Sequence, residues 1–124
     1  MMKKAMLTSL FSAFIIILII ILLFTIACIY VRLDQEKYKE FSVGKWENHP
    51  GKRWLMIDDF EAKYPIDTLT RETIKELLGE NGLIENEIGL TYTAGRPSWS
   101  IYTAYYRLTL DEKGSCFGTY VYYD

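Results

Sequence analysis

The residues that could act as acids, bases, nucleophiles or metal ligands are scattered along this chain of 124 residues. His49 is the only histidine, and it lies in a turn-forming segment without a nucleophile or a second ligand nearby in the sequence. Asp58, Asp59 and Glu61 could hold a hard cation, but neighbouring helix positions point in different directions and the glycine pattern of a calcium loop is missing. We therefore predict a non-catalytic protein without a metal site or a cofactor.

The two cysteines lie in unlike surroundings. Cys116 falls in a predicted strand without a second cysteine or a histidine near it, which is typical of a packed thiol. Cys28 follows Thr25-Ile26-Ala27, and this order resembles the cleavage box of bacterial lipoproteins, in which the cysteine receives a lipid. Lipidation at Cys28 is thus one of two interpretations of this segment.

The other interpretation is a transmembrane helix. An uncharged run of 22 residues, 10–31, contains Cys28 and continues beyond it. As a helix this run would be about 33 Å long, which matches the roughly 30 Å hydrocarbon core of a bilayer. The apolar core of a cleaved signal peptide is shorter, about 7–15 residues. We expect an uncleaved span, with a cleaved chain lipidated at Cys28 as the alternative.

The charges around the run bear on its orientation. Lys3 and Lys4 lie in the short tail before it, and four basic residues follow it closely: Arg32, Lys37, Lys39 and Lys45. Counting basic residues alone would place the following domain in the cytoplasm. A short basic tail before a span is nevertheless typical of a signal-anchor. We therefore expect a single-pass protein of the inner or cytoplasmic membrane, with its C-terminal domain outside the cytoplasm.

The part of the chain after the span is mildly acidic. Of the 14 lysines and arginines only Lys3 and Lys4 precede the run, which leaves 12 basic against 16 acidic residues and a formal net charge of −4. Binding of nucleic acid calls for a basic patch. The composition therefore argues against a nucleic-acid partner.

Four segments follow from these patterns. A tail at 1–9 and the transmembrane helix at 10–31 precede a linker or helical stalk at 32–44, and a small domain occupies 45–124. Apolar residues spaced for one helical face predict a first helix in this domain over 52–64.

A second helix is expected shortly afterwards. Thr70 is a suitable N-cap, Ile74, Leu77 and Leu78 would face the core, and Gly79 would end the helix.

Alternation of apolar residues replaces the helical period in the last third of the chain, which predicts strands. Phe117, Thr119 and Val121 are expected to face the core from the last strand. The predicted fold is α+β, with two helices packed on a three-stranded antiparallel meander and one N-terminal transmembrane helix before them. The expected strands lie at 88–94, 102–110 and 117–123, with a hairpin turn at 111–114.

Tyrosines are concentrated in these predicted strands, where they commonly pack with one end in water. Helices cover one face of such a sheet and leave the other open, and we expect Tyr105, Tyr120 and Tyr122 to line the open face. Aromatic residues on an exposed sheet face can anchor a protein partner. These three tyrosines are therefore the candidate binding site.

Several short motifs occur in a fixed order over residues 41–121. A first helix carries an arginine, a methionine and an aspartate, a threonine opens a second helix ending in Leu-Leu-Gly, and a tyrosine-containing strand and an Asp–Gly hairpin follow. This order resembles the small protein A/outer membrane lipoprotein A family, the BamE-like domain. The resemblance implies a two-helix, three-stranded sandwich that acts outside the cytoplasm as an assembly or scaffold factor, without catalysis. The matching residues are Arg53, Met56, Asp59, Thr70, Leu77, Leu78, Gly79, Tyr92, Asp111 and Gly114.

The span, the order of helices and strands, and the tyrosine-rich sheet together predict a membrane-anchored extracytoplasmic binding or scaffold protein. It would serve envelope protein assembly or maintenance, with the membrane and another envelope protein as its partners. The alternative is an inhibitor or immunity protein that blocks an enzyme or a toxin, because the helix–helix–sheet unit also resembles that of some β-lactamase-inhibitory domains.

Overall fold

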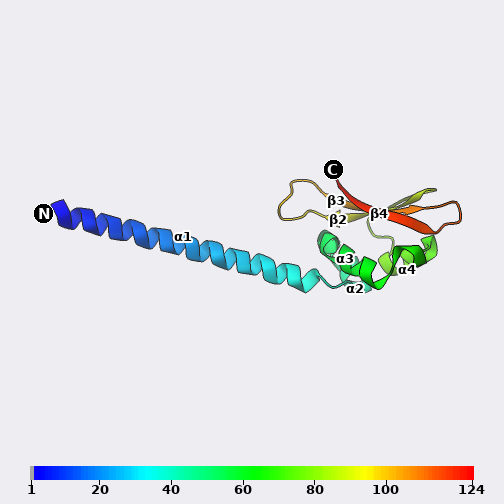
Figure 1. The fold of residues 1–124 in the computed structure, drawn as a ribbon, viewed down its shortest axis with the longest axis horizontal. Helices are drawn as coiled ribbons and strands as arrows, with labels where there is room; N and C mark the ends of the chain where they lie inside the picture. Colours follow the sequence, from blue (N-terminus) through cyan, green and yellow to red (C-terminus); the bar gives the residue numbers. More distant parts are fainter. Residues whose placement is uncertain (1) are drawn as a thin grey trace. The chain divides into compact units, whose positions relative to one another are not determined.

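The N-terminal part of the chain is one continuous helix. The computed structural model describes residues 2–124, in which α1 runs over Met2–Tyr38 (Figure 1). Of the helices in this described part, α1 is the one long and apolar enough to cross a membrane, and its apolar side chains are exposed. The prediction of an N-terminal helix able to span a membrane or act as a signal anchor is thus confirmed. The chain divides into two compact units, one up to Glu36 and one from Lys37 to Asp124.

Short helices open the second unit. The two predicted helices are present as α3 (Arg53–Lys63) and α4 (Arg71–Leu78). A further helix, α2 (Val43–Asn48), precedes them, and its N-terminus is capped by the hydroxyl of Ser42. Two single turns of 3₁₀ helix complete this part of the chain, η1 (Pro50–Lys52) and η2 (Ile66–Thr68).

Both ends of α4 follow from local chemistry. Thr70 has an extended backbone, and its hydroxyl accepts a hydrogen bond from the backbone N–H of Thr73 at 3.3 Å. Gly79 ends the helix with a φ of 72°, a conformation that glycine adopts at little cost. Between these caps Ile74 and Leu78 are buried, as predicted, and Leu77 is partly buried against the core.

Four antiparallel strands form one sheet in the order β1-β2-β3-β4, so the prediction of three strands is wrong by one. The missed strand, β1, has only four residues, and Leu83 alone among them is partly buried. Such a strand lacks the alternation of buried and exposed residues by which strands are recognised. The bounds are β1 (Leu83–Asn86), β2 (Gly89–Gly95), β3 (Ala104–Leu110) and β4 (Cys116–Tyr123).

Two residues expected within strands lie outside them. Ile88 precedes β2 and Tyr102 precedes β3, and their side chains are 62% and 55% exposed. The predicted strands therefore begin one and two residues too early, since β2 starts at Gly89 and β3 at Ala104.

A bulge in β4 turns one apolar residue away from the core. The register between β3 and β4 shifts between Thr109 and Leu110, which leaves Phe117 as the unpaired extra residue. Phe117 is 66% exposed, so the prediction that it faces the core is wrong. Thr119 and Val121 pair with buried residues of β3 and lie on the core side, as expected.

The helices cover one face of the sheet, and the core lies between the two layers (Figure 1). Trp46 of α2 is fully buried at its centre, and its ring lies 6.0 Å from that of Tyr92, 6.3 Å from Tyr106 and 6.4 Å from Phe60. Phe41, which falls within the segment expected to be a linker, packs at 4.9 Å from the ring of Phe60. The core therefore begins before the first predicted helix.

A buried arginine joins the parts of this core. Arg53 is fully buried at the start of α3. Its Nε donates to the carbonyl of Trp46 at 2.8 Å, and its Nη1 donates to the carbonyls of Asn81 at 2.9 Å and Thr93 at 3.1 Å. The guanidinium also lies 4.9 Å from the Trp46 ring. Burial lowers the pKa of Arg53, but an arginine keeps its charge in proteins. One cation thus ties α2, α3, β2 and the turn after α4 together.

Replacing Arg53 should destabilise the domain. We expect Arg53→Ala to lower the free energy of unfolding by about 3 kcal/mol or more, because three carbonyl groups lose a donor and a cavity forms. Urea unfolding of the full chain in detergent, followed by the fluorescence of the buried Trp46, measures this change. Arg96→Ala removes an exposed arginine and should stay within about 0.5 kcal/mol of wild type. Equal stability of the two variants would contradict the role of Arg53.

Candidate functional site

The uncovered face of the sheet carries the three tyrosines singled out in the sequence. In β3 alternate residues are buried, so Tyr105 and Arg107 point to the opposite, uncovered side. The register places Tyr105 opposite Tyr122 and Arg107 opposite Tyr120. Residues directly opposite in an antiparallel pair share a face. The structure thus brings Tyr105, Tyr120 and Tyr122 together on two neighbouring strands, and we call this surface the tyrosine face.

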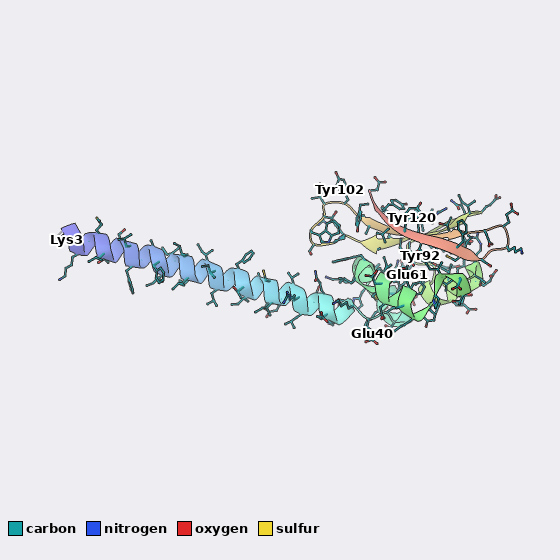
Figure 2. All side chains as sticks on the ribbon, in the orientation of Figure 1. Lys3, Glu40, Glu61, Tyr92, Tyr102 and Tyr120 are labelled. Atoms are coloured by element: carbon teal, nitrogen blue, oxygen red, sulfur yellow. The ribbon has the colours of Figure 1, made fainter. Side chains whose placement is uncertain are left out.

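The rings of the tyrosine face contact one another. Tyr105 and Tyr122 stack with centroids 5.2 Å apart and planes inclined by 18°. The Tyr120 and Tyr122 rings lie 5.9 Å apart at 41°. Tyr120 is 53% and Tyr122 38% exposed. Figure 2 labels Tyr120 on β4, together with Tyr92 and Glu61, which belong to the side covered by the helices. Such a stack holds the rings in one orientation while leaving much of their surface in water.

An arginine extends the tyrosine face. Arg107 lies beside Tyr120, and its Nη1 donates to the Thr91 hydroxyl at 2.8 Å. Its Nη2 lies 3.4 Å from the side-chain oxygen of Asn86 and passes close over Gly89. No carboxylate pairs with this guanidinium among residues 2–124. Alternation in this strand places Arg107 on the same side as Tyr105, two residues before it. Arg107 was nevertheless not among the residues predicted to bind a partner.

The edge of the sheet next to the tyrosine face is covered only at its start, where the N–H of Cys116 donates to the carbonyl of Leu69 at 2.9 Å. Thr103 and Asp124 exchange both backbone hydrogen bonds at 3.1 Å. Bonded and non-bonded pairs alternate along an antiparallel ladder, so the N–H and C=O groups of Thr119, Val121 and Tyr123 point away from β3. The strand carries neither a charged residue nor a proline, which are the usual means of blocking an edge. A further strand could therefore pair with β4 from Thr119 to Tyr123.

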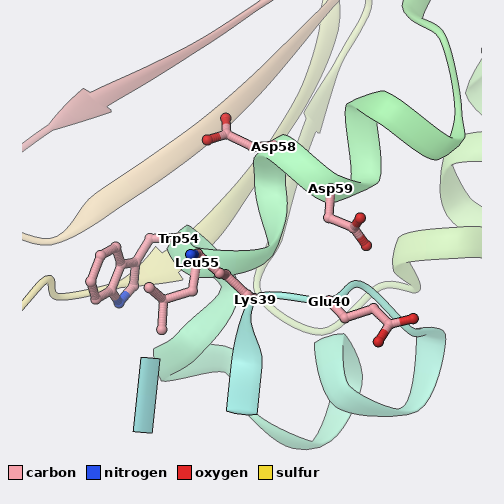
Figure 3. Close-up of a pocket in the computed structure, with 6 residues that line it drawn as sticks. All are labelled: Lys39, Glu40, Trp54, Leu55, Asp58 and Asp59. Atoms are coloured by element: carbon pink, nitrogen blue, oxygen red, sulfur yellow. The ribbon is translucent and has the colours of Figure 1, made fainter. Parts of the chain in front are cut away.

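A shallow depression of about 610 Å³ lies on α3 (Figure 3). Trp54 and Leu55 line one end, and Asp59 and Glu40 lie at the other. Asp59 accepts a hydrogen bond from the backbone N–H of Phe41 at 2.6 Å and pairs with Lys63 at 2.9 Å. Lys63 and this N–H lower the pKa of Asp59. The carboxylate is thus engaged in holding the segment before α2 against α3.

The other polar residues considered in the sequence lie apart from one another. The His49 ring packs against Tyr38 at 4.9 Å, and Asp58 is exposed on α3. Cys116 is buried, and burial raises the pKa of its thiol. Cys28 is exposed on α1. Within the described chain no three His, Cys, Asp or Glu residues gather closely enough to hold a metal ion.

A half-buried carboxylate on α3 organises the covered side of the sheet. Glu61 accepts hydrogen bonds from the hydroxyls of Tyr106, at 2.8 Å, and Thr119. Burial, together with this carboxylate, raises the pKa of Tyr106. Burial also raises the pKa of Tyr92, whose hydroxyl donates to the carbonyl of Gly79 at 2.7 Å. The two tyrosines of the core are therefore structural, in contrast to those on the open face.

Comparison of the chain with known proteins found no match. No protein-family model matches the chain, and no curated protein or solved structure matches it. The resemblance to the small protein A/outer membrane lipoprotein A family therefore stays a prediction. Any function must be argued from the tyrosine face, the β4 edge and α1.

The Tyr106–Glu61 hydrogen bond makes stability depend on alkaline pH. Below pH 10 we expect Tyr106→Phe to be about 1 kcal/mol less stable than wild type, because Glu61 loses a donor. The pKa of Tyr106 is raised above its ordinary value of 10.0 in the folded chain. The stability linked to its protonated form is therefore complete below that pH and is lost as the pH rises above it. The difference between the two proteins should narrow above pH 10.

Urea unfolding of the full chain in detergent at about pH 8 and about pH 11 measures this difference. Tyr120→Phe, which alters an exposed ring, is the control and should follow wild type at both values. A constant difference between wild type and Tyr106→Phe would contradict the linkage.

Proposed function

We propose that this chain is a non-catalytic binding protein, held at a membrane by α1, that presents the tyrosine face and the β4 edge to a protein partner. One observation carries the proposal: a stack of tyrosines, of which Tyr120 and Tyr122 are exposed, adjoins a strand whose outward backbone groups from Thr119 to Tyr123 have no hydrogen-bond partner within residues 2–124. Tyrosine and arginine supply much of the binding energy of protein interfaces. An unpaired edge supplies backbone hydrogen bonds to an extended segment.

The proposed partner segment is an extended strand. It would pair with Thr119, Val121 and Tyr123 through their outward N–H and C=O groups. Its alternate side chains would then lie beside Tyr120 and Tyr122. Since Arg107 has no carboxylate partner among the described residues, an acidic or polar side chain in the segment would find a donor there.

We place the domain on the extracytoplasmic side, in an inner or cytoplasmic membrane. A role in the assembly or maintenance of envelope proteins follows from the sequence resemblance and from the open edge, because proteins with exposed strands are the natural ligands of such an edge. The partner would then be another envelope protein that exposes a strand during assembly.

Photo-crosslinking in cells tests the binding surface. p-Benzoylphenylalanine placed at Tyr120 or Tyr122 of the full chain should form an adduct with one envelope protein, whereas the same group at Glu76, exposed on α4, should not. Val121→Pro should abolish the adduct from position 122, because proline removes an outward N–H without touching a bond to β3. Cooperative unfolding of that variant would show that the domain still folds.

Three results would contradict the proposal. Adducts of equal yield from position 76 would show that the tyrosine face does not bind the partner specifically. Recovery of lipid adducts alone would show that this face does not bind a protein. A single soluble enzyme or toxin in the adduct would favour the inhibitor or immunity protein instead.

The orientation has its own test. Alkaline phosphatase fused after Asp124 is expected to be active, because the enzyme matures only outside the cytoplasm, where its disulfides form. A reporter that is active only in the cytoplasm, fused at the same position, is the control and should be silent. The reverse pattern would place the domain in the cytoplasm.

A further inference from the structure

The loop between β2 and β3 exposes its largest apolar side chains. Trp99 is 68%, Ile101 80% and Tyr102 55% exposed, although a soluble domain usually covers such residues. Figure 2 labels Tyr102 in this loop. Arg96 is the loop's only charged residue. We call residues 96–103 the aromatic loop.

The aromatic loop is held in place by its own contacts. Pro97 at its start is fully buried, and the N–H of Ser100 donates to the carbonyl of Pro97 at 3.0 Å. The N–H of Tyr102 donates to the Ser100 hydroxyl at 3.0 Å, and Thr103 is bonded twice to Asp124. Several backbone groups are thus paired within the protein, while the apolar side chains are left outside. Because the loop is already ordered, it loses less conformational entropy on binding.

The base of the loop lies close to the first residues of the domain. Gly95, at the base of the loop, packs so closely on Gly51 that an added Cβ would lie 2.1 Å from the Gly51 carbonyl oxygen. The next residue, Lys52, has its ammonium 5.7 Å from the ring centre of Tyr38, the last residue of α1. Close contacts therefore connect the loop base to the first residues of the domain.

The chain between the apolar run and the domain is short. The run ends at residue 31 and the domain begins at Lys37. The intervening residues are helical, so they cover only about 9 Å. A bilayer crossed by α1 would hold this end of the domain near the lipid headgroups, at a high effective concentration.

We propose that the aromatic loop inserts Trp99, Ile101 and Tyr102 into the interfacial layer of the bilayer that α1 crosses. Tryptophan and tyrosine favour this layer, because their rings are apolar and their N–H or O–H groups stay hydrated. The basic residue of the loop, Arg96, fits the phosphate groups of lipids. The domain would thus have two attachments to the membrane, the helix and the loop.

Fluorescence of the full chain in lipid vesicles tests this proposal. Trp46 is buried and Trp54 partly buried, so subtracting the spectrum of Trp99→Phe from that of wild type isolates Trp99. In phosphatidylcholine vesicles the emission maximum of Trp99 should lie at a shorter wavelength than that of a fully exposed indole in water. The Trp99 emission should also be quenched by phosphatidylcholine brominated near the headgroup end of its chains, and be protected from iodide.

Matched variants sharpen the test. Ile101→Ser and Tyr102→Ser change exposed side chains and should reduce the quenching of Trp99 by brominated lipid while leaving the unfolding transition unchanged. Trp54→Phe, on α3, is the control and should not alter the Trp99 signal. Since the vesicles contain no other protein, the result is independent of the protein partner proposed for the tyrosine face. Trp99 quenched by iodide and unaffected by brominated lipid would overturn the proposal.

Discussion

The burial of one positive charge constrains the whole domain. Arg53 has no carboxylate at hydrogen-bond distance in the described structure, and its charge is balanced by three backbone carbonyl groups and the face of Trp46. Carbonyls can balance a guanidinium only if they are held at fixed positions, since an unpaired buried charge is costly. The end of α2, the turn after α4 and the end of β2 must therefore converge on the start of α3. The aromatic core fills the space that this convergence leaves.

The tyrosines on the two faces of the sheet have different surroundings. On the covered side Tyr92 and Tyr106 direct their hydroxyls to Gly79 and Glu61, so polar groups are satisfied inside the protein. On the uncovered side the rings of Tyr105 and Tyr122 stack on each other. The same residue type is thus structural on one face and available for binding on the other, and the strand period of two residues decides which.

Strongly periodic elements could be predicted from the sequence, and elements without a pattern could not. The spacing of apolar residues gave α3 and α4, and alternation in β3 placed Tyr105 away from the core. Alternation could not give β1, because Ile84 is 61% exposed, nor the bulge at Phe117, which depends on the register with β3. The pairing of Tyr105 with Tyr122 also depends on that register, so the residues of the tyrosine face could be proposed but their stacking could not. Nothing local marks Arg53 as buried, since its acceptors come from residues 7, 28 and 40 positions away.

The two proposed surfaces meet at the last residues of β4. Tyr122 points to the open face and stacks on Tyr105, while its neighbour Tyr123 contacts Trp99 of the aromatic loop with ring centres 5.3 Å apart. A strand paired along β4 would reach the outward backbone groups of Tyr123 and so lie against the base of that loop. A loop fixed in lipid would therefore keep this end of the open edge at the membrane surface. A partner emerging from the same bilayer would reach the edge from there, without crossing the surrounding solvent, and this geometry suits a protein that receives strands at a membrane better than one that captures soluble ligands.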